Sequence, residues 1–283
     1  MDLEKKIIAI LGASFCVLLF FRYATSSDTP LALILQDEPQ SQELKIRKVN
    51  LTSVEDIEPI SSGMVQPILY SGADFLADLD GQEAKDAFIG IMLPSILVAK
   101  YNLKAQRARY QELLSEGTWT KQDTLFVEQL EKDYRTTDSE IMLRRLNTHP
   151  NSIVLVQAAV ESGWGKSRFF REANNVFGVW SFDPKEDRIK AGSSRPELQV
   201  YLKKYDNIAQ SVIDYFKTVG RVGAYKEFRI NRANTDDYNK LLPYLDKYSE
   251  RGMEYVEQLR GMIVSNKLSL YDSFELDFNE IKK

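Results

Sequence analysis

The stretch NSIVLVQAAVESGWGKSRFFREANNVFG, residues 151–178, decides the fold of this chain. Residues 153–160 are almost entirely apolar, and a run of this kind predicts a helix that is buried in the core of a domain. Asn151 or Ser152 can cap this helix directly after Pro150. The sequence therefore predicts a core helix around which the rest of the domain packs.

Glu161 sits at the C-terminal end of this helix, because Gly163 and Gly165 end the helical run. The negative end of the helix dipole disfavours an ionised carboxylate there, and the adjacent Val160 and Trp164 can desolvate it further. A carboxyl group that stays protonated near neutrality is what a general acid for glycoside cleavage requires. A glutamate that faces water at a frayed helix end is the alternative that the sequence leaves open.

The composition argues against nucleic-acid binding, a disulfide and a zinc site. The 283 residues are 43% hydrophobic and 28% charged, which predicts one main globular domain with appendages. The formal net charge of −4 gives no basic surplus for binding phosphates, so we expect no nucleic-acid partner. The chain has one cysteine, Cys16, and one histidine, His149, which excludes an intramolecular disulfide and makes a zinc site poor chemistry. We expect no metal and no cofactor, and we expect His149 to be a loop residue.

An uncharged run, IIAILGASFCVLLFF, occupies residues 7–21 between two lysines and an arginine. We predict residues 1–24 to be a signal anchor or signal peptide, with residues 7–23 as a single pass through a bacterial inner membrane and the body in the periplasm. Residues 24–26 match a cleavage site only approximately, and cleavage would release a soluble periplasmic protein.

The remainder divides into three segments. Residues 25–67 read as a spacer, because the stretch to about Gln66 carries Pro30, Pro39 and Pro59 and mixed charges without a helical period. We predict residues 68–146 to be the helical N-terminal part of the domain and residues 147–283 its catalytic region. Apolar periods predict helices over 82–116, with a kink at Pro94, and from Thr120 onward, over 208–219 and over 253–263.

Residues 179–206 break this helical pattern. Turn residues interrupt the segment, and Leu198, Val200 and Leu202 alternate, which predicts a small β-hairpin. The expected fold class is α+β and predominantly α-helical.

Two motifs resemble a known family: ESGWGKS at 161–167 and NNVFG at 174–178 are similar to the signature of glycoside hydrolase family 73, the bacterial glucosaminidases. GAYKEFRINRA at 223–233 and YSERGMEYV at 248–256 resemble the Bax-type bacterial subgroup of that family. The resemblance covers roughly residues 85–275.

This resemblance implies a lysozyme-like domain, a peptidoglycan or related N-acetylglucosamine glycan as substrate, and Glu161 as the catalytic acid. Tyr225 matches a tyrosine that flanks the acid in the family, and the NNxFG turn lines the glycan cleft. Tryptophan and tyrosine rings have apolar faces that suit sugars, although ordinary core packing is the alternative for each aromatic residue. The expected substrate-binding residues are Trp164, Asn174, Asn175, Phe177, Gly178, Trp180 and Tyr225.

Many relatives carry a second catalytic carboxylate on the hairpin. Glu197 is the best candidate for this carboxylate by position, and Glu186 and Asp187 are the other candidates. For all three, the alternative is that the side chain is simply exposed at the surface and has no catalytic role.

The resemblance implies an endo-β-N-acetylglucosaminidase that cleaves β-1,4 bonds. Two other functions remain: a lytic transglycosylase, which uses the same acid without water, and a non-catalytic glycan-binding tether in the envelope. The helices at 82–146 could in addition bind a protein partner, which the sequence does not identify.

Overall fold

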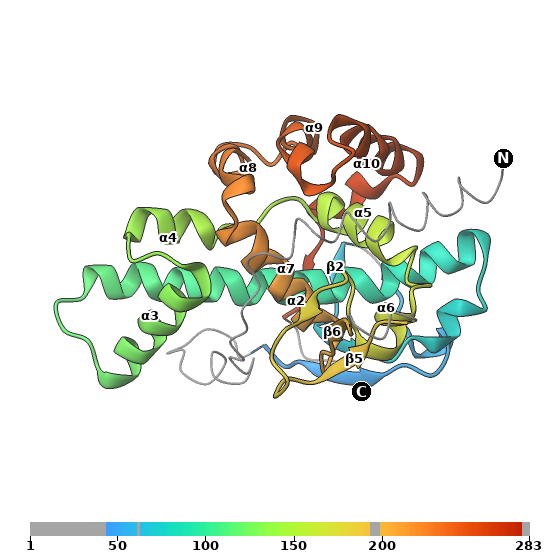
Figure 1. Cartoon of the computed structure of the whole chain (residues 1–283), viewed down its shortest axis with the longest axis horizontal. Coiled ribbons are helices and arrows are strands. Elements are labelled where there is room, and N and C mark those ends of the chain that lie inside the picture. Colours follow the sequence, from blue (N-terminus) through green and yellow to red (C-terminus); the bar gives the residue numbers. More distant parts are fainter. Residues whose placement is uncertain (1–43, 61–62, 193–198, 279–283) are drawn as a thin grey trace.

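The computed structural model describes residues 44–60, 63–192 and 199–278, which form a mostly helical body with three small β-sheets (Figure 1). The predicted signal anchor, residues 1–24, lies outside the described residues. The predominantly helical α+β class is confirmed. The α-helices are α2 (Gly81–Ser115), α3 (Lys121–Tyr134), α4 (Ser139–Arg145), α5 (Asn151–Ser162), α6 (Arg168–Ala173), α7 (Ile208–Arg221), α8 (Lys226–Asn231), α9 (Tyr238–Leu241) and α10 (Met253–Ser265).

Short elements connect these helices. The strands are β1 (Arg47–Asn50), β2 (Met64–Val65), β3 (Ile68–Ser71), β4 (Trp180–Ser181), β5 (Arg188–Lys190), β6 (Tyr201–Lys203) and β7 (Glu275–Leu276). The 3-10 helices are η2 (Val54–Asp56), η3 (Asp74–Ala77), η4 (Gly223–Tyr225), η5 (Leu242–Tyr248) and η6 (Leu268–Ser273).

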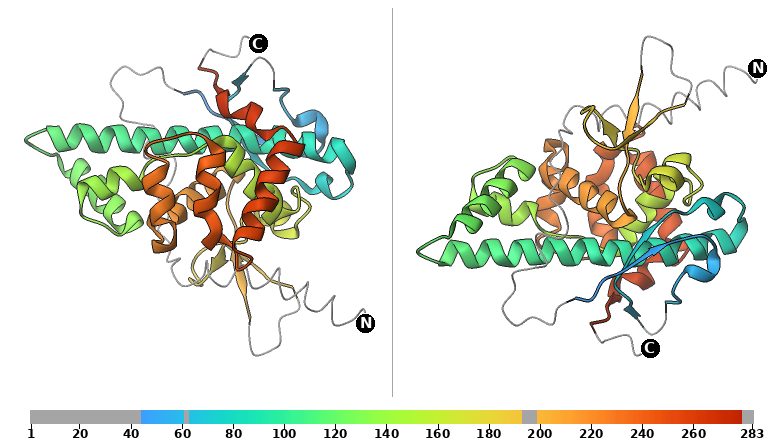
Figure 2. Two further views of the ribbon diagram at one scale, coloured as in Figure 1. Left: turned by 90° about the horizontal axis from the view of Figure 1, so that it is seen from above. Right: turned by 90° about the horizontal axis from the view of Figure 1, so that it is seen from below.

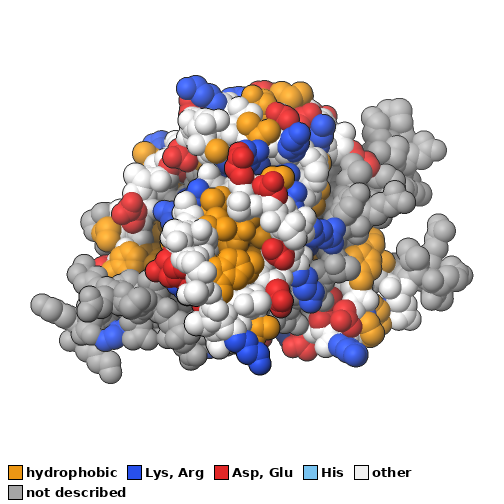
Figure 3. Space-filling view, turned by 90° about the vertical axis from the view of Figure 1, so that its left-hand side faces the viewer, with side chains coloured by type: hydrophobic (Ala, Val, Ile, Leu, Met, Phe, Trp, Pro, Cys, Tyr) orange, Lys and Arg blue, Asp and Glu red, His pale blue; other side chains and the backbone are white. Residues whose placement is uncertain are grey.

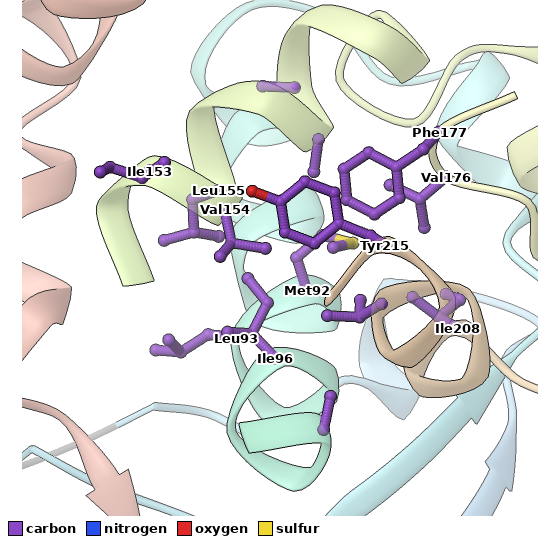
Figure 4. Packing of buried hydrophobic residues seen from close by; sticks show 14 of the residues in the cluster. Met92, Leu93, Ile96, Ile153, Val154, Leu155, Val176, Phe177, Ile208 and Tyr215 are labelled. Carbon is purple, nitrogen blue, oxygen red and sulfur yellow. The ribbon is translucent and has the colours of Figure 1, made fainter. Parts of the chain in front are cut away.

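Helix α2 runs through the centre of the body and packs against α5 and α7 (Figure 1). Its residues 87–99 are buried without interruption, and Figure 4 shows their apolar side chains meeting those of α5 and α7. We expected a kink at Pro94; the helix continues through that position, where the Ser95 hydroxyl donates to the Ile91 carbonyl at 3.0 Å. Among the described residues α2 alone is long and apolar enough to span a membrane, but 78% of its most apolar window is buried inside the protein. It is the core helix of the domain.

A second, smaller core lies at the C-terminal end of α2, where α3 and α4 fold back on it. Thr120 caps α3 and exchanges hydrogen bonds with Asp123, as the expected helix start requires. Figure 3 views this end of the molecule and shows apolar side chains at the surface among charged ones. The exposed large apolar residues of these elements are Leu114, Trp119, Leu125 and Ile141.

The expected spacer is shorter than we predicted, since residues 44–60 and 63–67 belong to the folded body. Strand β1 pairs in parallel with β3, and β2 pairs in parallel with β7 near the C-terminus. Figure 2 shows from two sides the blue N-terminal segment beside the red C-terminal one. Strands of two to four residues are too short to give a periodic signal, which is why the prolines and mixed charges suggested a linker.

Residues 179–206 form a three-stranded antiparallel sheet with the order β4-β6-β5. Strands β5 and β6 make the expected hairpin, and β4 adds to the other edge of β6 through the Trp180–Leu202 pair. Glu197, the favoured second carboxylate, lies in the segment 193–198, outside the described residues.

Candidate active site

Helix α5 is fixed at its N-terminal end by a residue from the other end of the chain. We expected Asn151 or Ser152 to be the cap, but the helix already begins at Asn151. Asp272 of η6 accepts hydrogen bonds from the Ser152 backbone N–H at 2.7 Å and from its hydroxyl at 2.8 Å. A carboxylate at this position satisfies free helix donors and complements the positive end of the helix dipole.

At its other end, α5 stops in a run of three left-handed residues. Gly163, Trp164 and Gly165 have φ values of 60°, 58° and 79°. The turn brings the backbone of Gly165 against Leu76 and Phe88, so a β-carbon at position 165 would lie 2.6 Å from Leu76 Cδ1. The two glycines therefore end the helix as predicted, with Ser162 as its last residue, directly after Glu161.

Glu161 is half-buried, and its carboxyl group is removed from water. Burial raises the pKa of Glu161 to about 7, although the hydrogen bond from Tyr255 and the positive charge of Arg251 both act to lower it. The Tyr255 hydroxyl donates to Glu161 Oε1 at 3.1 Å. The carboxyl group is thus poised to hold a proton near neutrality.

Three tyrosines, Tyr225, Tyr248 and Tyr255, surround this carboxyl group. The rings of Tyr248 and Tyr255 stack at 5.6 Å with only 5° between their planes, and Tyr225 packs on Tyr248 at 5.9 Å. Burial raises the pKa of all three hydroxyls, and the charge of Glu161 raises it further. The structure thus brings Tyr225 to Glu161, while sequence reasoning missed Tyr248 and Tyr255, although both lie in the quoted stretch 248–256.

The asparagines of the NNVFG turn hold the backbone together. Asn174 has left-handed φ of 51°, accepts from the Gly72 N–H and donates to the Tyr205 carbonyl. The side chain of Asn175 is buried and is bonded to the backbone of Val179 and Lys203. Both amides are occupied in joining this turn to its neighbours.

The aromatic candidates lie in different places. Phe177 is buried, and its ring stacks on Tyr215 at 4.5 Å, so it supports the core (Figure 4). Trp164 packs edge-on against Phe88 of α2 at 5.5 Å. Trp180 is half-buried on β4, 6.2 Å from the ring of the exposed Phe182.

Gly178 has φ of 66°, and a β-carbon there would meet nothing within 4 Å. The backbone conformation at this position favours glycine, whereas the space around it does not require one.

The two described hairpin carboxylates differ in their surroundings. Glu186 is largely buried and lies 3.5 Å from Lys203 Nζ, which also pairs with Asp214 at 3.3 Å. Asp187 is exposed, and its carbonyl accepts from the Lys204 N–H. Glu186 is therefore engaged in a structural ion cluster, whereas Asp187 is exposed on the hairpin surface.

No group of three or more His, Cys, Asp and Glu side chains suited to a metal ion occurs within the described ranges.

Comparison with known families assigns the class of this protein. Residues 137–268, which include Glu161 and the three tyrosines, match the family model Glucosaminidase, described as mannosyl-glycoprotein endo-beta-N-acetylglucosaminidase. The chain is a glycoside hydrolase. More particularly, residues 137–268 match the glucosaminidase model, and the chain resembles the Bax-type glucosaminidases of glycoside hydrolase family 73.

Two curated relatives have similar sequences. Protein bax of Escherichia coli is 25% identical over 201 residues, a match that spans 66% of this chain and 71% of the relative. Exo-glucosaminidase LytG of Bacillus subtilis is 25% identical over 177 residues, which spans 56% of this chain and 60% of LytG.

Solved structures with partial similarity include the catalytic domain of the autolysin Auto from Listeria monocytogenes. It is 20% identical, with a TM-score of 0.37, and the match covers 59% of this chain and 97% of that domain. The glycoside hydrolase domain of FlgJ from Salmonella typhimurium is 22% identical, with a TM-score of 0.36 and coverages of 49% and 88%.

Proposed function

We propose that this glucosaminidase cleaves β-1,4 glycosidic bonds of peptidoglycan, or of a related N-acetylglucosamine glycan, with Glu161 as its general acid. The observation that carries the proposal is the carboxyl group of Glu161, whose pKa is raised to about 7 by burial at the C-terminal end of α5. Such a group is protonated near neutral pH and can release its proton when a base appears beside it.

In the proposed reaction, Glu161 gives its proton to the bridging oxygen of the scissile bond. The bond between that oxygen and the anomeric carbon breaks, and positive charge develops on the sugar ring. A water molecule then attacks the anomeric carbon and loses a proton to a base. We propose Glu197 for the role of this base or of a stabilising charge, with Asp187 as the alternative; the ion pair of Glu186 with Lys203 makes that carboxylate less suited.

A lysozyme-like arrangement for the catalytic region is part of the same proposal. It is supported by the buried acid helix α5, which lies in a helical body beside the small sheet β4-β6-β5. The NNVFG turn is tied to this sheet, because the Asn175 amide donates to the carbonyls of Val179, next to β4, and of Lys203 on β6.

The location is proposed from sequence. We propose that residues 7–23 anchor the chain in a bacterial inner membrane and that the body lies in the periplasm, where peptidoglycan is accessible. Sequencing the N-terminus of the mature protein tests this, since a start near Ser26 or Ser27 would contradict the anchor and leave export intact.

Incubation of the full-length protein with purified peptidoglycan, followed by mass analysis of the fragments, tests the reaction. Hydrolysis gives fragments with a free reducing N-acetylglucosamine end, whereas a lytic transglycosylase gives products lighter by one water. Internal cleavage gives fragments of mixed length, while release of single terminal sugars would indicate exo cleavage, as in the name of LytG. Binding without any fragment release would contradict the proposal and support a glycan tether.

A further inference from the structure

A line of buried polar side chains leads from the end of α8 towards Glu161. Arg232 Nη1 lies 3.2 Å from His149 Nδ1, and His149 Nε2 lies 2.9 Å from the hydroxyl of Tyr215 on α7. The exposed fractions of Arg232, His149 and Tyr215 are 3%, 1% and 0%. Most polar groups buried to this degree are hydrogen-bonded, and in these three residues the hydrogen bonds determine which atoms carry the hydrogens.

The line continues to Glu161 through α5 and α10. The Tyr215 hydroxyl donates to Gln157 Oε1 at 2.7 Å, Gln157 Nε2 donates to the Tyr255 hydroxyl at 3.4 Å, and that hydroxyl donates to Glu161 Oε1 at 3.1 Å. Figure 4 shows the Tyr215 ring among apolar side chains, with its hydroxyl directed toward α5.

Arg232 determines which partner donates in each hydrogen bond of this series, because a guanidinium group can only donate. His149 Nδ1 must accept from it, which places the ring hydrogen on Nε2 and makes that nitrogen the donor to Tyr215. Burial, together with the charges of Arg232 and Lys100, holds the pKa of His149 well below its usual range, so the ring stays neutral. Every later link then donates in the direction of Glu161.

We propose that this hydrogen-bond line fixes which oxygen of Glu161 carries the catalytic proton, and that His149 and Tyr215 are positioning residues that act through Tyr255. The inference rests on the proposed role of Glu161 as acid. A protonated carboxyl has one hydroxyl oxygen and one acceptor oxygen. Since Tyr255 donates to Oε1, that oxygen is the acceptor and the proton resides on Oε2, which makes no hydrogen bond with Tyr255.

Removing the Tyr215 hydroxyl tests whether the donor-to-acceptor order of the hydrogen bonds at His149 and Tyr215 determines the hydrogen bond that Tyr255 makes to Glu161. In Tyr215→Phe the amide of Gln157 loses its donor and can turn over, so that Tyr255 donates to Gln157 instead of Glu161. The charged form of Glu161 then loses a hydrogen bond, which raises its pKa; the other groups facing it, Arg251, Tyr248 and Tyr225, are unchanged.

We expect Tyr215→Phe and Tyr255→Phe to displace the alkaline limb of the kcat/KM profile in the same direction, to higher pH. At the pH optimum we expect kcat to fall about tenfold, the scale of one hydrogen bond to a charged group. Tyr134→Phe is the matched control, because Tyr134 is fully buried and its hydroxyl has no hydrogen-bond partner in the described part of the chain. This control should leave the profile unchanged.

A shift in Tyr255→Phe with a wild-type profile in folded Tyr215→Phe would overturn the inference, because it would show that the line ends at Tyr255. Near-normal activity of Glu161→Gln would instead overturn the proposed acid, so the two failures are distinguishable.

A second measurement needs no variant. Because the chain has a single histidine, ¹⁵N-histidine labelling gives one pair of imidazole signals in the NMR spectrum. We expect a neutral ring with hydrogen on Nε2 throughout about pH 5 to 8. Hydrogen on Nδ1, or titration to the imidazolium within that range, would overturn the inference.

Discussion

The Tyr255 hydroxyl donates to Glu161 Oε1 at 3.1 Å, although the two residues are 94 positions apart in the sequence. The contact exists because α10 packs against α5. It lowers the pKa of Glu161, but desolvation is the larger effect and the net pKa is raised. The raised pKa of Glu161 therefore results from helix packing.

Glu161→Gln keeps the size of the side chain and removes the proton donor. We expect fragment release from peptidoglycan to fall about 10²–10⁴-fold while circular dichroism shows a folded protein. Glu197→Gln should slow release less severely. Glu140→Gln, on a side chain that is 83% exposed, is the control and should have no effect. Near-normal cleavage by folded Glu161→Gln would mean that Glu186, Asp187 or Glu197 is the donor.

The pH dependence of kcat/KM follows from the raised pKa. A general acid must be protonated in the free enzyme, so activity should decline as the pH rises through about 7. The measurement is the initial rate of glycan cleavage at low substrate concentration across a pH series. An alkaline limb near 4.5, the ordinary value for a glutamate, would contradict the burial of this carboxyl group.

The same carboxyl group costs stability at high pH. Because its pKa is higher in the folded than in the unfolded protein, its stabilising contribution is complete below about 4.5 and is lost as the pH rises through about 7. Glutamine does not ionise, so Glu161→Gln does not lose stability as the pH rises. At pH 8 the free energy of unfolding of the variant should exceed that of the wild type by on the order of 2–3 kcal/mol, and at pH 4 the difference should disappear. Urea unfolding at both pH values measures this. A variant that is less stable than wild type at pH 8 would contradict it.

The turn after α5 should tolerate a methyl group at one glycine and reject it at the other. Both glycines have left-handed backbone, but a β-carbon at Gly163 meets nothing within 4 Å, whereas one at Gly165 lies 2.6 Å from Leu76 Cδ1. We expect Gly163→Ala to cost about 1 kcal/mol of unfolding free energy, and Gly165→Ala about 1–3 kcal/mol more. Equal losses in urea unfolding would show that Leu76 moves aside freely.

Chelation should leave activity unchanged. The chemistry proposed for Glu161 needs no metal, and within the residues that the structure describes no cluster of metal-ligating side chains occurs. Cleavage assays with and without EDTA measure this directly. Loss of activity that one specific ion restores would contradict the prediction.

The sequence by itself determined the long helices. The apolar periods at 82–116, 208–219 and 253–263 correspond to α2, α7 and α10, because helical periodicity and caps such as Thr120 are local properties of the chain. The glycines after Glu161 likewise placed this carboxyl group at a helix end, because the backbone conformation where a helix ends depends on the residues at that point.

Only the tertiary structure decided what surrounds Glu161. Tyr255 reaches Glu161 from α10, Asp272 caps α5 from η6, and β1 joins β3 through strands too short for a pattern. Desolvation and hydrogen bonding depend on which atoms lie within a few ångströms, and those atoms come from segments far apart in the chain. The sequence therefore identifies the carboxyl group of Glu161 as a candidate, but its pKa and the donors of its hydrogen bonds are determined only when the helices pack.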